Sequence, residues 1–254
     1  MKLILVKLFT ILVIIGCQEQ KLIKLTDNQY VELINTNQLS NSDKIKLIDE
    51  FGNTINQDSL SLLYRKYDLK ETAFVNSNGQ VQEIHFKRKD PIEILGINCE
   101  HITSKLDSIE KLDQASRNYY NPAVDYSNLQ FVISVIETCG MPNNYSELNA
   151  IFLVLQHNHS IYQKKYIPLL REKSSQGLIA KSKLALMEDR ILMNDGAPQI
   201  YGTQVTRKNR NENWKLYDLY EPEKVNYRRK KIGLGPIESY LENFDINFNI
   251  EQIE

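Results

Sequence analysis

The side chains best suited to chemistry lie in the second half of the chain. Gln156-His157 ends the most apolar internal segment, Asp189-Arg190 lies on a later helical stretch, and the polar run 199–204 follows soon after. Histidine is the usual general base near neutral pH, a carboxylate can orient its ring, and arginine stabilises developing negative charge. We predict that these residues meet in space and form the functional part of the protein.

His157 and Asp189 are the expected catalytic pair, with His157 as general base and Asp189 orienting it. At the end of a buried helix the dipole favours the charged ring and burial favours the neutral ring, a balance that suits acid–base work. The alternative is a core histidine with both ring nitrogens hydrogen-bonded. His159 gives a His-x-His pair, but a third ligand is missing, so we expect no metal site.

The other polar residues of this region are expected to bind a ligand. A guanidinium can fork onto a carboxylate or phosphate, and in an extended run alternate side chains project to one side. One of Arg228 and Arg229 should point inward from its helix, because consecutive positions diverge by about 100°. The alternative is a structural network that joins helices. The expected ligand-binding set is Gln156, Arg190, Gln199, Tyr201, Thr203, Gln204 and Arg229.

The motifs that carry this set resemble those of a bacterial family of unknown function found in secreted and envelope proteins. In chain order they are Asp113-Gln114-x-x-Arg117, Gln156-His157, Ala185-x-x-x-Asp189-Arg190, Gln199-x-Tyr201-Gly202-Thr203-Gln204 and Arg228-Arg229-x-x-x-Gly233-Leu234. They cover roughly residues 106–240. The resemblance implies a candidate site and no particular chemistry.

The first 16 residues resemble a bacterial lipoprotein signal peptide. Lys2 and Lys7 precede the apolar run 8–15, which is well short of the ~20 apolar residues of a membrane-spanning helix. Gly16-Cys17 resembles the end of a lipobox, although Ile15 departs from the small residue usual there. The resemblance implies that Cys17 is lipidated, with palmitate among its acyl chains, and anchors the protein to a membrane of the cell envelope. The alternative is a plain secretory signal with an incidental cysteine.

The remaining chain predicts an α+β protein. Residues 17–28 form a tether, and 29–91 form a small βαββ-like module whose last two strands flank Asn78-Gly79, a strong hairpin signal. Asp90-Pro91 marks the boundary, and residues 92–254 form a mostly helical domain. Its central helix is capped by Asn144 and is apolar all round. We expect Pro168 to kink or end a later helix.

The composition and the absence of known motifs disfavour several classes of function. The chain has 254 residues and a net charge of −1, so nothing favours nucleic-acid binding. No nucleophile elbow, phosphate loop or zinc-protease motif is present, and we expect no cofactor. Cys99 and Cys139 are expected to be unpaired, although an oxidising envelope would allow a disulfide.

Three functions remain open. The polar residues bind a small polar or anionic ligand; or they form a hydrolase-like active site; or they only hold together a structural or protein-interaction lipoprotein.

Overall fold

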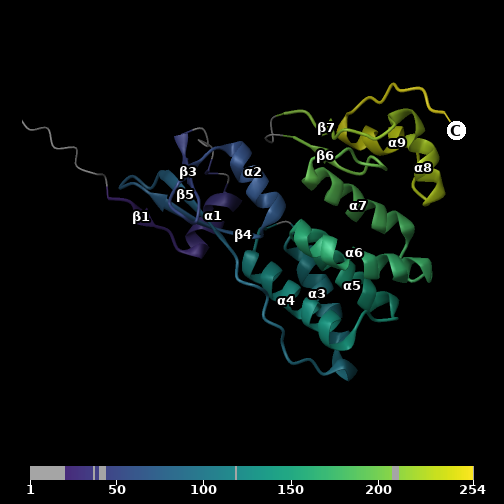
Figure 1. Cartoon of the computed structure of the whole chain (residues 1–254), viewed down its shortest axis with the longest axis horizontal. Helices are drawn as coiled ribbons and strands as arrows, with labels where there is room; N and C mark the ends of the chain where they lie inside the picture. Colours follow the sequence, from purple (N-terminus) through teal and green to yellow (C-terminus); the bar gives the residue numbers. More distant parts are fainter. Residues whose placement is uncertain (1–20, 37, 40–43, 118, 208–211, 254) are drawn as a thin grey trace, which may run out of the picture.

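A computed structural model describes residues 21–36, 38–39, 44–117, 119–207 and 212–253. The expected signal peptide and Cys17 lie outside these residues. The chain is α+β, as predicted: a five-stranded sheet forms near the N-terminus and a helical region follows (Figure 1). Among the described residues, no helix is both long and apolar enough to cross a membrane.

The N-terminal module is a sheet packed against two helices. Thr26 and Asn56 cap the helices through their side chains, and the predicted Asn78-Gly79 turn joins the last two strands. The strand order is β1-β4-β5-β2-β3, with β2 parallel to β5 and the other pairs antiparallel. Because β1 pairs with β4, the module begins within the segment expected to be tether. Its elements are β1 (Ile23–Lys24), α1 (Asp27–Asn35), β2 (Lys46–Ile48), β3 (Thr54–Ile55), α2 (Gln57–Lys66), β4 (Leu69–Val75) and β5 (Val81–Arg88).

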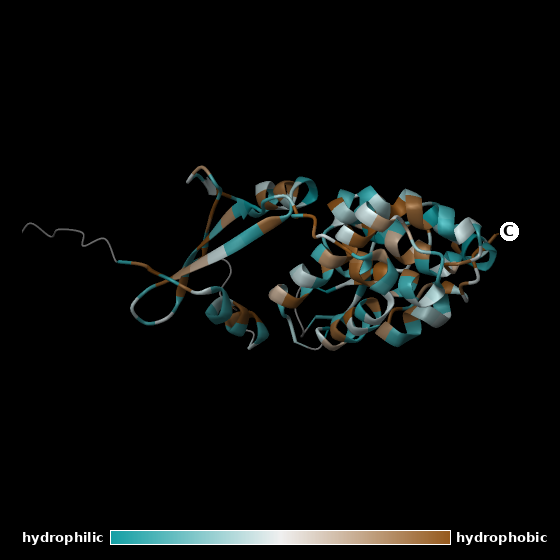
Figure 2. Ribbon diagram, turned by 90° about the horizontal axis from the view of Figure 1, so that it is seen from below, coloured by the Kyte–Doolittle hydropathy of each residue, from teal (hydrophilic) through white to brown (hydrophobic). Residues whose placement is uncertain are grey.

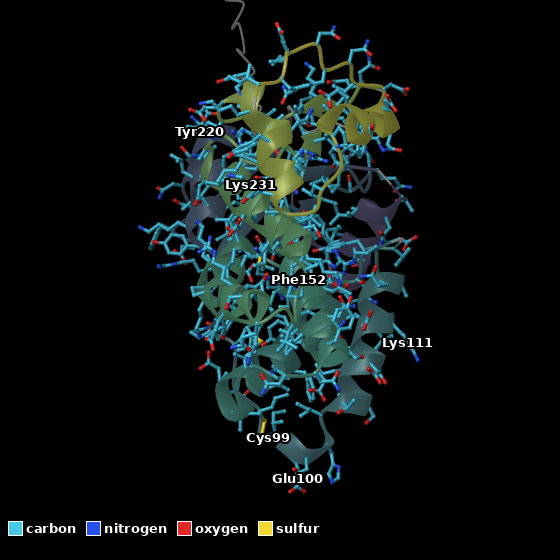
Figure 3. All side chains as sticks on the ribbon, turned by 90° about the vertical axis from the view of Figure 1, so that its right-hand side faces the viewer. Cys99, Glu100, Lys111, Phe152, Tyr220 and Lys231 are labelled. Carbon is cyan, nitrogen blue, oxygen red and sulfur yellow. A yellow bond between two sulfur atoms is a disulfide. The ribbon has the colours of Figure 1, made fainter. Side chains whose placement is uncertain are left out.

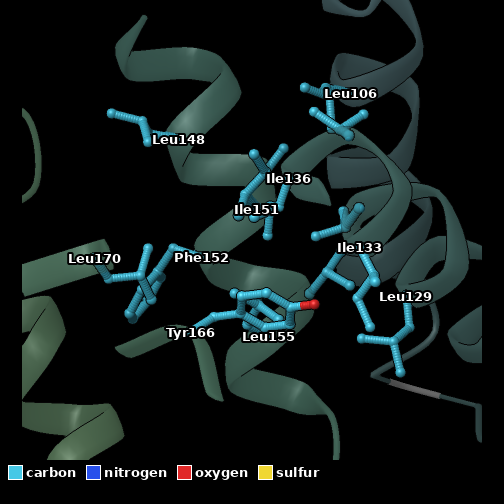
Figure 4. Packing of buried hydrophobic residues seen from close by; sticks show 14 of the residues in the cluster. Leu106, Leu129, Ile133, Ile136, Leu148, Ile151, Phe152, Leu155, Tyr166 and Leu170 are labelled. Atoms are coloured by element: carbon cyan, nitrogen blue, oxygen red, sulfur yellow. The ribbon is translucent and has the colours of Figure 1, made fainter. Parts of the chain in front are cut away.

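A helical bundle follows, and its central helix is α5, as its apolar sequence predicts. Leu148, Ile151 and Leu155 of this helix are fully buried among side chains of the neighbouring helices (Figure 4). Pro168 lies inside α6 without ending it. The elements are η2 (Cys99–His101), α3 (Thr103–Ala115), α4 (Pro122–Cys139), α5 (Tyr145–His157), α6 (Ser160–Ser175) and α7 (Lys181–Asp195).

The cysteine prediction is wrong. Cys99 and Cys139 form a disulfide that joins η2 to the C-terminal end of α4 (Figure 3). Their separation of 40 residues in sequence hid the contact, because the irregular segment before α3 had no periodicity from which to place Cys99.

The C-terminal part forms a small lobe with a core of its own, centred on Val225, Ile237 and Leu241. Gly202 has a φ of +67°, which favours glycine, and a Cβ there would lie 2.4 Å from Ile237 Cδ1, so any other residue would force the buried Ile237 side chain to move. The elements are β6 (Val205–Thr206), β7 (Lys215–Leu216), η3 (Pro222–Lys224), α8 (Val225–Lys231), α9 (Ile237–Leu241) and η4 (Glu242–Phe244).

The module and the helical part are two bodies that follow one another along the long axis of the molecule (Figures 1 and 2). Their hydrophobic clusters share no residue. Each body is therefore stabilised by a core of its own.

Candidate functional site

His157 pairs with a buried carboxylate that comes from α3. Its Nδ1 lies 2.7 Å from Asp113 Oδ2, and the side chains are 20% and 1% exposed. A carboxylate accepts but does not donate, so Nδ1 carries the proton, and Nε2 is an acceptor whenever the ring is neutral. No described residue hydrogen-bonds Nε2. The arrangement holds the ring in one tautomer with its basic nitrogen unused.

Asp113 is itself held in place by neighbours from the end of α3. Gln114 Nε2 donates to Asp113 Oδ2 over 3.0 Å, and Arg117 Nη2 lies 3.6 Å from the other carboxylate oxygen. Arg117 also pairs with Asp125 at the start of α4. The buried carboxylate therefore has a histidine, an amide and a guanidinium around it, which offsets its desolvation.

The prediction that Asp189 orients His157 is therefore wrong, because Asp113 occupies that place. Asp189 is fully buried on α7 and accepts hydrogen bonds from the loop that follows. The donors are Ile200 N (2.7 Å), Tyr201 N (3.0 Å), Thr203 N (3.0 Å) and Thr203 Oγ1 (2.9 Å). A carboxylate that receives this many donors organises the loop and has no capacity left for His157.

The two glutamines of the polar run also bond within their own segment. Gln199 Nε2 donates to the carbonyls of Gln204 (3.1 Å) and Tyr217 (3.0 Å), and Gln199 Oε1 accepts from Gln204 N (2.9 Å). Both glutamines are buried. The run is thus a structural turn, held against the segment that follows β7 and contains Tyr217.

Arg229 is the arginine that points inward, as predicted, and it too bonds to backbone. It donates to the carbonyls of Gly235 (2.6 Å) and Tyr201 (2.7 Å). Arg228 donates to the carbonyl of Ile200 over 2.8 Å. Burial lowers the pKa of the Arg229 guanidinium, which fits a charge satisfied mainly by carbonyl dipoles.

Tyr201 differs from its neighbours because its side chain is not part of this turn. Its backbone atoms serve Asp189 and Arg229, while its half-buried ring has a raised pKa, chiefly from burial and then from the nearby charges of Glu188 and Asp189. The structure shows no hydrogen bond from its hydroxyl to a described residue.

Arg190 connects the polar turn to the end of α5. Its Nη1 donates to the Gln156 carbonyl over 2.7 Å and its Nε to Gln204 Oε1 over 3.2 Å. Burial lowers its pKa. The Gln156 carbonyl also accepts from Gln163 Nε2 at 3.0 Å, so the partly negative end of α5 receives one cation and one amide.

Gln156 contributes its carbonyl to this contact, but not its side chain. The residue is 5% exposed, and its Oε1 has no hydrogen-bond partner among the described residues; the same is true of buried Gln163 Oε1. The predicted site is thus divided. Asp189, Arg229 and residues 199–204 form one closed network, His157 belongs to a separate pair with Asp113, and Arg190 lies between them.

Asp113 is the residue that the sequence reasoning left out of the site, although a signal was present. Ile102, Leu106 and Ile109 mark the buried stripe of α3, and position 113 continues it with the same helical spacing. A charged residue in an apolar stripe needs a buried partner. His157 supplies it.

The described residues contain no group of three or more His, Cys, Asp or Glu side chains arranged to hold a metal ion. His159 caps α6, with Nδ1 accepting from Ile161 N over 3.3 Å.

Fold and site together define a helical domain whose polar motifs mostly stabilise its own loops, beside one histidine–carboxylate pair. Residues 137–251 match a protein family described as a family of unknown function, DUF6624. The match begins after Asp113, so it contains His157 and the polar turn but not the carboxylate that holds His157. A comparison with the curated proteins gives no match. A comparison with solved structures gives none either.

Proposed function

We propose that this protein is a lipid-anchored component of the cell envelope that binds a small polar ligand at His157. One observation carries the proposal: a buried carboxylate fixes the His157 ring through Nδ1, while the partly exposed ring keeps Nε2 free of described partners. A fixed acceptor of this kind suits a ligand that presents an O–H or N–H group.

An anionic ligand has less support than a neutral one. Arg190 and Arg229, expected to receive it, direct their donors at carbonyl and amide oxygens of the chain. Arg229 also interacts electrostatically with the carboxylate of fully buried Asp189. We therefore favour a hydroxyl- or amine-bearing molecule over a phosphate or carboxylate.

The second candidate function is general-base catalysis by the same histidine. A base hydrogen-bonded to an orienting carboxylate is the arrangement that acid–base enzymes use, and Asp113 supplies the carboxylate here. Arg117, whose Nη2 lies 3.6 Å from Asp113 Oδ1, is then a candidate cation for stabilising negative charge. The purely structural alternative fits the network around Asp189, whose members serve one another.

Binding is tested by thermal unfolding with a panel of neutral hydroxylated and amine-bearing compounds: glycerol, glucose, N-acetylglucosamine and serine. A ligand present at 100 times its Kd adds about 2.7 kcal/mol to the free energy of unfolding. His157→Gln keeps a donor for Asp113 but replaces the fixed basic ring nitrogen with a weaker, differently placed amide oxygen, so it should greatly reduce the shift. His85→Gln is the matched control, since His85 lies on the sheet and pairs with Glu83. An equal shift in wild type and His157→Gln would contradict the proposal.

Envelope location rests on the N-terminal pattern and on the disulfide. Disulfides persist in oxidising compartments, and Cys99–Cys139 closes a long loop of the helical domain. Cys17→Ser should abolish incorporation of labelled palmitate and move the protein from the detergent phase to the aqueous phase. Retained labelling and partitioning would show that Cys17 is not the anchor.

A further inference from the structure

The five-stranded sheet of the module has one covered face and one open face. Glu71 lies on the covered face, where it accepts from the hydroxyls of Tyr30 in α1 and Tyr64 in α2. Successive residues of a strand alternate between the two faces, and residues directly opposite one another on paired strands share a face. The register therefore places six chemically distinctive residues on the open face: Lys24, Lys46, Lys70, Phe74, His85 and Lys87.

This face has an aromatic centre surrounded by lysines. The rings of Phe74 and His85 stack with their centroids 4.4 Å apart, and the four lysines around them are exposed. Glu83 is the one carboxylate that the described strands place on this face, and it pairs with His85 at 2.9 Å. The open face therefore presents an excess of positive charge.

Two of the lysines repel each other within the sheet. Lys70 and Lys87 lie directly opposite one another on β4 and β5, an arrangement that lowers the stability of a sheet. Asp27 pairs with Lys70 at 2.9 Å, but these side chains are 70% and 55% exposed, so the pair offsets little of the repulsion. An anionic surface laid over both lysines would relieve it.

The helical domain leaves this face uncovered. It contacts the module at the end of α1, where Asn35 exchanges two hydrogen bonds with the Tyr120 backbone, and before β4, where Tyr162 donates to Asp68 over 3.4 Å. It also contacts α2, which packs near α6. Among the described residues, none of these contacts involves the lysines of the open face.

The anchor proposed at Cys17 would hold the open face close to a lipid surface. Cys17 lies outside the described residues, and the six residues that lead from it to Ile23 span at most about 20 Å. β1 begins at Ile23 and contributes Lys24 to the open face. It lies at the end of the module away from the helical domain (Figure 1). The sheet is thus the part of the described chain nearest to the anchor.

We propose that the open face of the sheet docks on the headgroups of an anionic lipid surface through Lys24, Lys46, Lys70 and Lys87. This proposal rests on the lipid anchor of the proposed function, which keeps the sheet and the headgroups together. Each lysine close to such a surface strengthens binding roughly fivefold, and the attraction falls off within about 10 Å at ordinary salt.

The reactivity of single lysines tests the docking on full-length protein bound to the outside of vesicles. The vesicles contain phosphatidylcholine alone or an equal mixture of phosphatidylcholine and phosphatidylglycerol, and mass spectrometry follows the acetylation of each amine. Lys46 and Lys87 should react about tenfold more slowly on the mixed vesicles, and high salt should remove the difference. Lys105 and Lys111, exposed on α3, should react equally on both.

Two double variants that lose the same charge make the test specific. Lys46→Gln with Lys87→Gln should make the acetylation of Lys24 equal on the two kinds of vesicle. Lys105→Gln with Lys111→Gln should leave Lys24 protected as in the wild type. Equal acetylation of Lys46 and Lys87 on neutral and mixed vesicles would overturn the proposal. Protection that follows protein concentration instead of lipid charge would also overturn it, because a second copy of the chain would then cover the face.

Flotation with neutral vesicles reports the anchor separately. Protein that does not float with them has no anchor, which would contradict that part of the proposed function. Acetylation on the mixed vesicles would still decide whether the sheet docks, since the attraction of the lysines to phosphatidylglycerol does not require the acyl chains.

Discussion

Two buried carboxylates of the helical domain serve different purposes. Asp189 accepts four groups from a single loop and is fully enclosed. Asp113 accepts from a histidine that reaches the surface. The acceptors of Asp189 are taken up by hydrogen bonds within the fold. Asp113, in contrast, leaves Nε2 of its partner His157 available. A dense polar motif in a sequence is therefore no measure of binding capacity; what counts is how many donors and acceptors remain unused.

The largest expected effect on stability comes from replacing Asp189, the carboxylate that organises the loop. Asp189→Ala leaves three backbone N–H groups and one hydroxyl without their acceptor, so it should lower the free energy of unfolding by about 4 kcal/mol. Glu188→Ala, the preceding residue on α7, removes an exposed pair with Arg171 and should cost less than about 1 kcal/mol. Urea denaturation measures both. Similar losses in the two variants would show that Asp189 does not organise the loop.

A substitution at Gly202 tests how closely the same loop packs against α9. Gly202→Ala places a Cβ against buried Ile237 and strains a positive φ, at an expected cost of about 3 kcal/mol. Gly233→Ala has a similar φ of +78° with nothing within 4 Å, so it should show only the backbone strain, about 1 kcal/mol. The difference between their unfolding midpoints isolates the contact with Ile237. Equal losses would mean that α9 can shift away from the turn.

A substitution at Arg190 tests whether the contact between the end of α5 and the polar turn contributes to stability. Arg190→Lys cannot fork onto the Gln156 carbonyl and Gln204 Oε1 together, so about 1.5 kcal/mol of stability should be lost. Arg171→Lys, on the exposed pair with Glu188, should cost about 0.5 kcal/mol or less. Chemical denaturation again gives the comparison. If the two lysine variants are equally stable, the link between α5 and the turn contributes nothing.

The parts of the fold that the sequence predicted are those set by local patterns. The Asn78-Gly79 hairpin, the Asn144 cap and the buried centre of α5 each follow from a few neighbouring residues. Pro168 was expected to kink or end its helix, and α6 continues past it, which excludes an end at this residue.

The site was predicted less well because its contacts join distant segments. Asp113 and His157 are 44 residues apart, and nothing local distinguishes the carboxylate that reaches His157 from the one that serves a loop. Helical spacing predicted that one of Arg228 and Arg229 points inward, but it did not predict that Arg229 donates to two carbonyls of other segments. Every residue has a backbone carbonyl, so the pattern of side chains does not indicate which carbonyls will accept from an arginine.

The smallest expected effect, a coupling close to zero between His157 and Asp189, is the sharpest test of the division into two polar clusters. In a double-mutant cycle, His157→Ala and Asp113→Asn should couple by about 1–2 kcal/mol, because the two residues share a hydrogen bond to a buried charge, and His157→Ala removes it. His157→Ala and Asp189→Asn share no partner, so their effects on the free energy of unfolding should add within about 0.5 kcal/mol. Coupling of His157 with Asp189 as large as with Asp113 would mean that the polar turn and the histidine act as one unit. Additivity would leave His157 and Asp113 as a pair whose function is separate from the stability of the turn.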